Sequence, residues 1–175
     1  VFIKIFTVDT HVYGTKTIKA RGISSGEIVV SRYVLIPNIT AVIPPSGTTG
    51  ITVTGTGNGY QAGEIVQIFF GTDNESRNPY CAASNLGTFS TTFVVNVQPA
   101  GVTTIRAQGI GSGRVAVSIF GISPKIVSVT PTQGTLGVLV AVNGNGFAPN
   151  EGIAIDFGTS RSITKLVADN NGEFT

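Results

Sequence analysis

Few side chains in this chain are of types that could catalyse a reaction or bind a metal. His11 is the only histidine and Cys81 the only cysteine. A zinc site needs about four such ligands, and a cysteine nucleophile needs an oriented histidine. Serine is plentiful, but a serine nucleophile also needs an oriented base, and we expect His11 in a surface loop. The sequence therefore predicts no catalytic residue, no metal centre and no cofactor, and we expect that the protein is not an enzyme.

A glycine-rich run, Gly55-Thr-Gly57-Asn-Gly59, resembles a nucleotide-binding loop in composition. Glycines let backbone amides approach a phosphate closely, but a dinucleotide-binding loop must open a helix. Residues 64–70 follow the run and have the pattern of a strand. A tight turn that requires positive φ accounts for this run and for Gly144-Asn-Gly146. The pattern therefore favours a turn over a phosphate site.

Two short turns are rich in the side-chain oxygens that calcium prefers, at residues 73–75 and 169–173. Such turns more often only keep a loop hydrated, so a bound calcium ion is the less favoured interpretation. Two triplets, at Asn38 and Asn74, have the N-glycosylation pattern, which matters only in a secreted chain. Asn74 lies in a long loop and is the better candidate, because a glycan on Asn38 would lie at a domain junction.

The composition is poor in charge and rich in glycine. Charged residues make up 11% of the chain, against about 25% in an ordinary soluble domain. Eleven basic and nine acidic residues give a net charge of +2 without a basic run, so we expect no nucleic-acid partner. No stretch reaches the roughly 18 unbroken apolar residues of a membrane helix, so we expect no membrane span. A single cysteine excludes an internal disulfide framework.

Alternation of apolar and polar residues predicts an all-β chain. Val53 and Gly55 alternate with threonines, and Val66, Ile68 and Phe70 repeat this period of two after a turn. Turn signals every 8 to 15 residues separate six or seven such strands within residues 39–125. This spacing is typical of a two-sheet sandwich.

The sequence also repeats itself with a shift of 87 residues, as from Ile39 to Ile126. Residues 126–137 match residues 39–50, and residues 17–22 match residues 104–109. Residues 172–175 followed by residues 1–5 resemble residues 87–95. We therefore expect tandem repeats that are circularly offset, so that both terminal domains are incomplete.

The repeated order is Ile-x-x-Val-x-Pro-x-x-Gly-x-x-Gly, a valine-rich strand, Gly-Asn-Gly-Phe/Tyr and a strand ending in Phe-Gly-Thr. This order resembles the IPT/TIG family of immunoglobulin-like domains and related repeats of microbial surface proteins. The resemblance implies sandwich repeats that serve as spacers, adhesion modules and assembly units. Its motifs are glycines and prolines at turns, so they specify fold better than activity.

These observations predict three parts. Residues 1–38 form the C-terminal half of an immunoglobulin-like domain, residues 39–125 a complete domain, and residues 126–175 an N-terminal half. Half a sandwich leaves backbone groups unpaired and an apolar face uncovered. We therefore expect residues 1–38 of a neighbouring unit to complete residues 126–175. The neighbour is a copy of the chain or an adjacent repeat of one longer chain.

Several strands are apolar on both faces, which indicates that both faces are covered. The alternative is a wider core or apolar residues scattered over the surface. We expect the strand at residues 1–8 to add to the sheet begun by residues 126–175, with main-chain hydrogen bonds and alternate apolar side chains. The predicted assembly interface consists of Val1, Phe2, Ile3, Ile5, Phe6, Val8, Leu139, Phe157 and Phe174.

The function predicted from these features is structural. The chain is expected to be a subunit or repeat segment of an extracellular or cell-surface filament, sheath or fibre that assembles head to tail. The alternative is an adhesive or carbohydrate-binding module that uses Tyr80 and the loop around it, with surface glycans as ligands. A non-catalytic domain of a large enzyme is a third interpretation. Cys81 is interpreted as a small apolar residue, with a cross-link between chains as the alternative.

Overall fold

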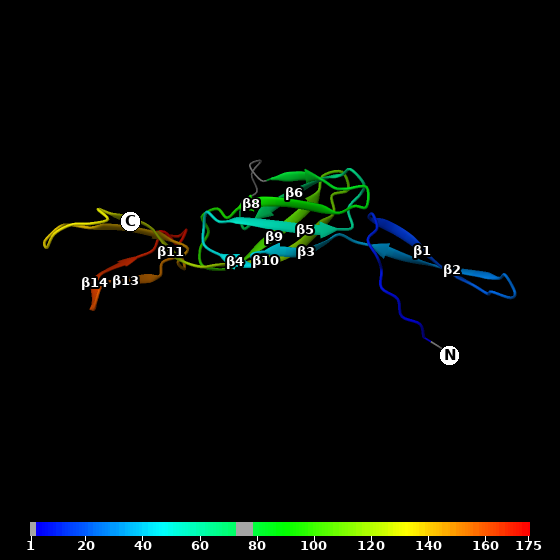
Figure 1. Cartoon of the computed structure of the whole chain (residues 1–175), viewed down its shortest axis with the longest axis horizontal. Helices are drawn as coiled ribbons and strands as arrows, with labels where there is room; N and C mark the ends of the chain where they lie inside the picture. Colours follow the sequence, from blue (N-terminus) through cyan, green and yellow to red (C-terminus); the bar gives the residue numbers. More distant parts are fainter. Residues whose placement is uncertain (1–2, 73–78) are drawn as a thin grey trace.

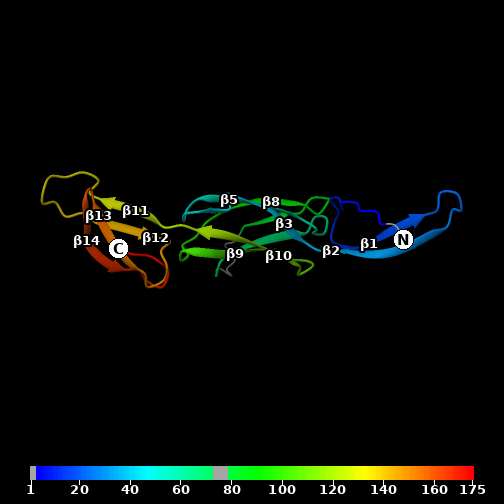
Figure 2. The same cartoon turned by 90° about the horizontal axis from the view of Figure 1, so that it is seen from below.

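The computed structural model describes residues 3–72 and 79–175. All regular elements among these residues are strands, so this part of the chain contains no helix that could cross a membrane. Three parts follow one another along the long axis: a hairpin, a sandwich and a pair of hairpins (Figures 1 and 2). The prediction of an all-β chain is therefore confirmed.

The middle part is a two-sheet sandwich. One sheet has the strand order β3-β5-β8 and the other has the order β4-β10-β9-β6-β7. Nearly all of its pairs are antiparallel, and only β4 runs parallel to its neighbour β10. The strands are β3 (Asn38–Ile43), β4 (Ser46–Gly47), β5 (Thr52–Asn58), β6 (Ile65–Phe70), β7 (Tyr80–Ala82), β8 (Phe89–Val94), β9 (Gly101–Gly109) and β10 (Val115–Ile122).

Alternate residues of these strands meet in one core between the sheets. Phe70 lies at its centre, with its ring 5.3 Å from that of Phe93 and 5.5 Å from that of Phe120. The buried Tyr60 hydroxyl donates a 2.8 Å hydrogen bond to the Ala107 carbonyl, so its polar group is satisfied. The predicted inward residues are therefore confirmed in β5 and β6. The buried apolar residues of this core are Val53, Tyr60, Val66, Ile68, Phe70, Ala83, Phe89, Phe93, Val95, Ile105, Ala107, Ala116, Phe120 and Ile122.

The N-terminal part is a single hairpin of β1 (Gly14–Arg21) and β2 (Ile28–Leu35) that extends away from the sandwich (Figure 1). The described residues 3–8 pair with no strand of their own chain, so the strand predicted at residues 1–8, which was to join a neighbouring unit, stays a prediction. An extended segment needs a free sheet edge to become a strand, and the edge predicted to receive it belongs to the C-terminal part, at the other end of the molecule.

The C-terminal part has two separate hairpins. One joins β11 (Lys125–Thr130) to β12 (Ala141–Asn145), and the other joins β13 (Gly152–Phe157) to β14 (Ser160–Val167). A small cluster of Ile153, Ala168 and Phe174 lies between them, with four half-buried neighbours. This cluster is much smaller than the core of the middle sandwich, because only one hairpin covers each side.

The terminal hairpins have the same strand registers as parts of the middle sandwich. In β1–β2, Gly14 pairs with Leu35, and in β9–β10 Gly101 pairs with Ile122. Both residues of the second pair lie 87 positions after those of the first. Every other pair of the β1–β2 ladder recurs in β9–β10 with the same shift. The β1–β2 hairpin is therefore built like the β9–β10 hairpin.

The first C-terminal hairpin matches another part of the sandwich in the same way. The pairing of β11 with β12 repeats that of β3 with β5, including the irregularity, which falls after Ile126 in one ladder and after Ile39 in the other. Gly144 and Phe174 form a bridge, as Gly57 and Phe89 do in the sandwich. Both glycines are needed, because a Cβ atom there would collide with the phenylalanine ring.

Candidate assembly surfaces

The predicted interface residues near the N-terminus are exposed. Ile3 is 87% exposed and Ile5 is 85% exposed, and Phe6 and Val8 also lie at the surface. Val1 and Phe2 lie outside the described residues. Phe6 and Val8 line an open groove of about 530 Å³ together with Ile18, Tyr33 and Leu35 of the β1–β2 hairpin. The segment thus lies against its own hairpin without covering it.

At the other end of the molecule, two of the three predicted residues are exposed. Leu139 is 91% and Phe157 is 75% exposed. Phe174 is buried within the chain, where its ring lies 5.6 Å from that of Phe147. The structure does not bring the predicted N-terminal and C-terminal residues together within one chain, because they lie at opposite ends of its long axis (Figure 2).

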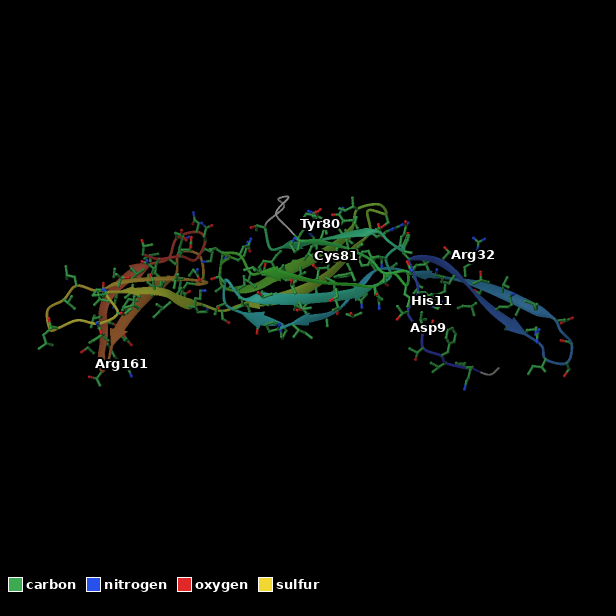
Figure 3. The ribbon with its side chains drawn as sticks, turned by 45° about the horizontal axis from the view of Figure 1, so that its top comes forward. Asp9, His11, Arg32, Tyr80, Cys81 and Arg161 are labelled. Carbon is green, nitrogen blue, oxygen red and sulfur yellow. The ribbon has the colours of Figure 1, made fainter. Side chains whose placement is uncertain are left out.

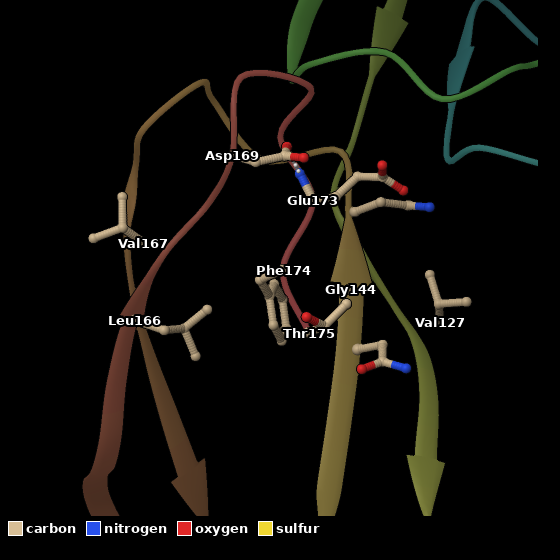
Figure 4. Close-up of a pocket in the computed structure, with 10 residues that line it drawn as sticks. Val127, Gly144, Leu166, Val167, Asp169, Glu173, Phe174 and Thr175 are labelled. Carbon is tan, nitrogen blue, oxygen red and sulfur yellow. Dashed lines mark hydrogen bonds between the residues drawn. The ribbon is translucent and has the colours of Figure 1, made fainter.

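The second open groove lies between the two C-terminal hairpins. It has a volume of about 530 Å³, and Val127, Leu166 and Phe174 contribute to its lining. Figure 4 shows Leu166 pointing toward Phe174, whose ring lies between the two hairpins. Gly144 and Phe174 exchange two backbone hydrogen bonds of 3.0 and 2.9 Å, so the chain at Phe174 already begins a strand beside β12. The groove between the two hairpins is therefore open to solvent.

Two glutamates that were not predicted from the sequence as site residues lie in equivalent turns. Glu64 is 7% exposed, and its carboxylate accepts hydrogen bonds from the amides of Gln61 (3.0 Å) and Ser112 (2.6 Å). Burial alone would raise the pKa of Glu64, but these hydrogen bonds outweigh it and hold the pKa below its ordinary value. This carboxylate ties the β5–β6 turn to the β9–β10 turn.

Glu151, which lies 87 residues after Glu64, has only part of this arrangement. Its carboxylate accepts a 2.7 Å hydrogen bond from the Ala148 amide, as Glu64 does from Gln61. The counterpart of Ser112 is Ser25, which lies in the β1–β2 turn at the other end of the molecule (Figure 1). A shift of 87 residues applied to charged side chains would have identified this pair from the sequence.

The residues considered for chemistry lie apart. His11 forms an exposed ion pair of 2.8 Å with Asp9 when protonated, and Cys81 lies half-buried on β7 (Figure 3). Burial raises the pKa of the Cys81 thiol, which makes it a weak nucleophile. In residues 3–72 and 79–175 no group of three His, Cys, Asp or Glu side chains could hold a metal ion.

The remaining candidate sites have local roles or lie outside the described residues. The Asp169 carboxylate accepts hydrogen bonds of 2.8 Å from the amides of Asn171 and Glu173, so it stabilises its own turn. Asn38 is the exposed first residue of β3, and Asn74 lies outside the described residues. Tyr80 is 70% exposed on β7, whereas Tyr60 is fully buried.

Comparison with known families matches residues 37–122 to the family model described as macroglobulin-like domain, an immunoglobulin-like fold family. No curated protein matches the chain. The matched segment contains all eight strands from β3 to β10, so the middle part is an immunoglobulin-like β-sandwich. Macroglobulin-like domains are typically extracellular. The resemblance is thus supported at the level of the immunoglobulin-like fold, and its IPT/TIG form stays a prediction.

Proposed function

We propose that the chain is a structural subunit or repeat segment of an extracellular filament, sheath or surface fibre, whose units join head to tail by completing a shared β-sandwich. The observation that carries this proposal is the agreement of strand registers between the terminal hairpins and the middle sandwich. On this proposal the protein acts by assembly and performs no catalysis.

The terminal parts supply complementary sets of strands. The β11–β12 hairpin corresponds to β3 and β5, and the β13–β14 hairpin corresponds to β6 and β7. The β1–β2 hairpin corresponds to β9 and β10. Because the two sets do not overlap, one C-terminal part and one N-terminal part together make a sandwich that lacks only counterparts of the two-residue strand β4 and of β8.

Residues 3–5 of the neighbouring unit are suited to take the place of β8. By the match of residues 1–5 with residues 91–95, Ile3 takes the place of Phe93 and Ile5 that of Val95. Both residues of the middle sandwich are at least 95% buried, whereas both isoleucines are exposed. Lys4 takes the place of Val94, which is 60% exposed, so a charge is placed where water reaches it. Apolar and polar residues thus alternate in this segment as a strand paired with β12 requires.

Completion would bury much of the exposed apolar surface of the terminal parts. Ile3, Ile5 and Phe157 are each at least 75% exposed. Full burial of such a side chain contributes about 1.5–3 kcal/mol. Main-chain hydrogen bonds along the added strand give further affinity and register. A head-to-tail contact of this kind propagates as a fibre where it does not close into a ring.

The match to a typically extracellular domain family supports a location outside the cell or at its surface. The sequence order shared with IPT/TIG repeats is consistent with a tandem arrangement, in which the offset halves belong to successive repeats. The neighbouring unit is then either a second copy of this chain or an adjacent repeat of one longer chain.

Replacement of Ile3 and Ile5 by aspartate tests the proposal. We expect the native chain to form long particles in electron microscopy that dissolve to 18.1 kDa chains on denaturation. The double variant should remain monomeric in light scattering with an unchanged circular dichroism spectrum, because the middle sandwich does not involve these residues. Lys4→Asp is the matched control and should still assemble. Fibres from the double variant would contradict the proposal.

A second outcome would favour the adhesive module instead. Tyr80 is 70% exposed on β7 and could stack on a sugar ring. If the native chain stays monomeric at its highest soluble concentration and glycan arrays show binding that Tyr80→Ala removes, adhesion becomes the better interpretation.

A further inference from the structure

The strand β13 has a free edge. Among the described residues it pairs only with β14, whereas its counterpart β6 lies between β7 and β9. The counterpart of β9 is β1, which pairs only with β2 in the described chain. The free edges of β13 and β1 therefore correspond to two strands that pair in the middle sandwich, and they lie at opposite ends of the molecule.

We propose that β13 pairs antiparallel with β1 of a second copy of this chain, in the one register that sets Lys19 opposite Asp156. The inference rests on the proposed function and specifies the second sheet of the completed sandwich. It specifies which strands pair and in which register, and head-to-tail assembly alone specifies neither.

The inward-facing residues support this register. In the middle sandwich β6 and β9 contribute the inward pairs Phe70 with Ile105, Ile68 with Ala107, and Val66 with Gly109. The proposed register contributes the pairs Phe157 with Ile18, Ile155 with Ala20, and Ile153 with Gly22. Two pairs are identical in residue type, and the third replaces valine by isoleucine.

Other registers lose this match. A slip of one residue turns every side chain of a strand to the opposite face. A slip of two residues sets Phe157 opposite Ala20 or Lys16, and no inward pair of the middle sandwich has either combination. The hydrophobic pattern therefore favours one alignment.

The outward-facing residues add a complementary charge. Phe69 and Arg106 are opposite one another in the middle sandwich, with the guanidinium 4.8 Å from the centre of the ring. In the proposed register Asp156 stands in the place of Phe69 and Lys19 in the place of Arg106. A pair of opposite charges thus replaces the contact between a cation and an aromatic ring. The Asp156 carboxylate is oriented by a 2.7 Å hydrogen bond from the Ser162 amide.

Glu151 accepts only one of the two turn hydrogen bonds that Glu64 accepts, and its missing partner supports the same alignment. Glu64 needs Gly109 beside it, because a Cβ atom there would collide with its carboxylate. The proposed register places Gly22 of the second copy beside Glu151 and brings the Ser25 amide to the position that the Ser112 amide holds at 2.6 Å from Glu64. The two turns containing Ser25 and Ser112 have the same backbone hydrogen bonds, so Ser25 is presented in the same way.

Disulfide trapping between two differently labelled chains tests the register. In a Cys81→Ser background, one chain carries Lys19→Cys and the other carries Asp156→Cys. We expect mixing under mild oxidation to give dimers of twice the 18.1 kDa chain mass on non-reducing gels. The control partner carries Ala154→Cys instead, and because its Cα lies about 7–8 Å from that of residue 19, it should cross-link at least tenfold less. Each variant alone measures the background, and Phe69→Cys with Arg106→Cys in one chain is the positive control.

The outcomes separate this inference from the proposed function. Preferential trapping through Ala154→Cys, or light scattering that shows association without either cross-link, would overturn the register while head-to-tail assembly stands. Absence of any association in light scattering would overturn both. Trapping of Lys19→Cys with Asp156→Cys at the expected preference supports both.

Discussion

The middle sandwich and the terminal hairpins contain the same strand ladders in different surroundings. Phe70 on β6 is 3% exposed, whereas Phe157 at the matching position of β13 is 75% exposed. Phe120 on β10 is fully buried, whereas Tyr33 on β2 is 43% exposed. Residue type and register are therefore alike, and only the presence of the opposite sheet differs.

The register of each hairpin is therefore determined by residues close in sequence, whereas the burial of its side chains is not. A hairpin's register depends on its turn and on the alternation of its strands. The β1–β2 and β9–β10 turns have the same two backbone hydrogen bonds, from Gly22 and Gly26 in one and from Gly109 and Gly113 in the other. An isolated two-stranded hairpin is at best marginally stable in water. The terminal hairpins thus have the form of a sandwich without its main source of stability.

The largest expected difference between the two regions concerns an aromatic core residue. Phe120→Ala should lower the free energy of unfolding of the middle sandwich by about 3–5 kcal/mol, because it leaves a cavity beside Phe70. Tyr33→Ala should change it by less than about 0.5 kcal/mol in the dilute, unassembled chain. Urea unfolding followed by circular dichroism measures both values. Equal losses would mean that the N-terminal hairpin contributes to the same cooperative unit.

Assembly should reverse this difference at Phe157. We expect Phe157→Ala to weaken association by about 2–3 kcal/mol, because the ring would occupy the core of the completed sandwich. Concentration-dependent light scattering provides the association constant. Val167→Ala, at the position of the exposed Ala82, is the matched control and should have little effect. A comparable loss in this control would point to a different contact surface.

A smaller effect is expected at Glu64. Its pKa is lowered in the folded sandwich, so its contribution to stability is complete above the ordinary value of 4.5 and is lost as the pH falls through the lowered value. Glu64→Gln should cost about 1–2 kcal/mol at neutral pH and flatten the stability curve as the pH falls below the ordinary pKa of 4.5. Urea unfolding across this pH range measures the effect.

Glu151→Gln is the comparison variant for Glu64→Gln. In the unassembled chain it should cost much less stability, because Glu151 is exposed and lacks the second turn. A loss as large as that of Glu64→Gln would show that the glutamate acts within its own turn alone.

The smallest expected effect is that of the cross-strand charges. Lys19→Asp or Asp156→Lys alone should weaken association about two- to fivefold, since exposed cross-strand ion pairs contribute about 0.2–1 kcal/mol. Chains that carry both changes should regain the native affinity. Light scattering at low and high salt measures this, and an equal loss in the double variant would argue against a direct pair.

Much of the middle fold could be predicted from residue patterns. The alternation around Val53 and Ile68 identified the strands and their inward faces, because side chains on a strand point alternately to its two faces. The exposed segment containing Ile3 and Ile5 could be recognised as strand-like, but its pairing could not be obtained within one chain. The brace at Glu64 was missed, because it joins turns 48 residues apart through backbone amides that carry no side-chain signal.

The sequence by itself determined the all-β class, the turn positions and the shift of 87 residues, since glycine, proline and period-two alternation act over a few residues. Only the tertiary structure decided which apolar residues are covered. Phe93 and Ile3 have the same local pattern, yet one is 5% and the other 87% exposed. Burial depends on which sheet lies opposite, and that is a property of contacts distant in sequence or between chains.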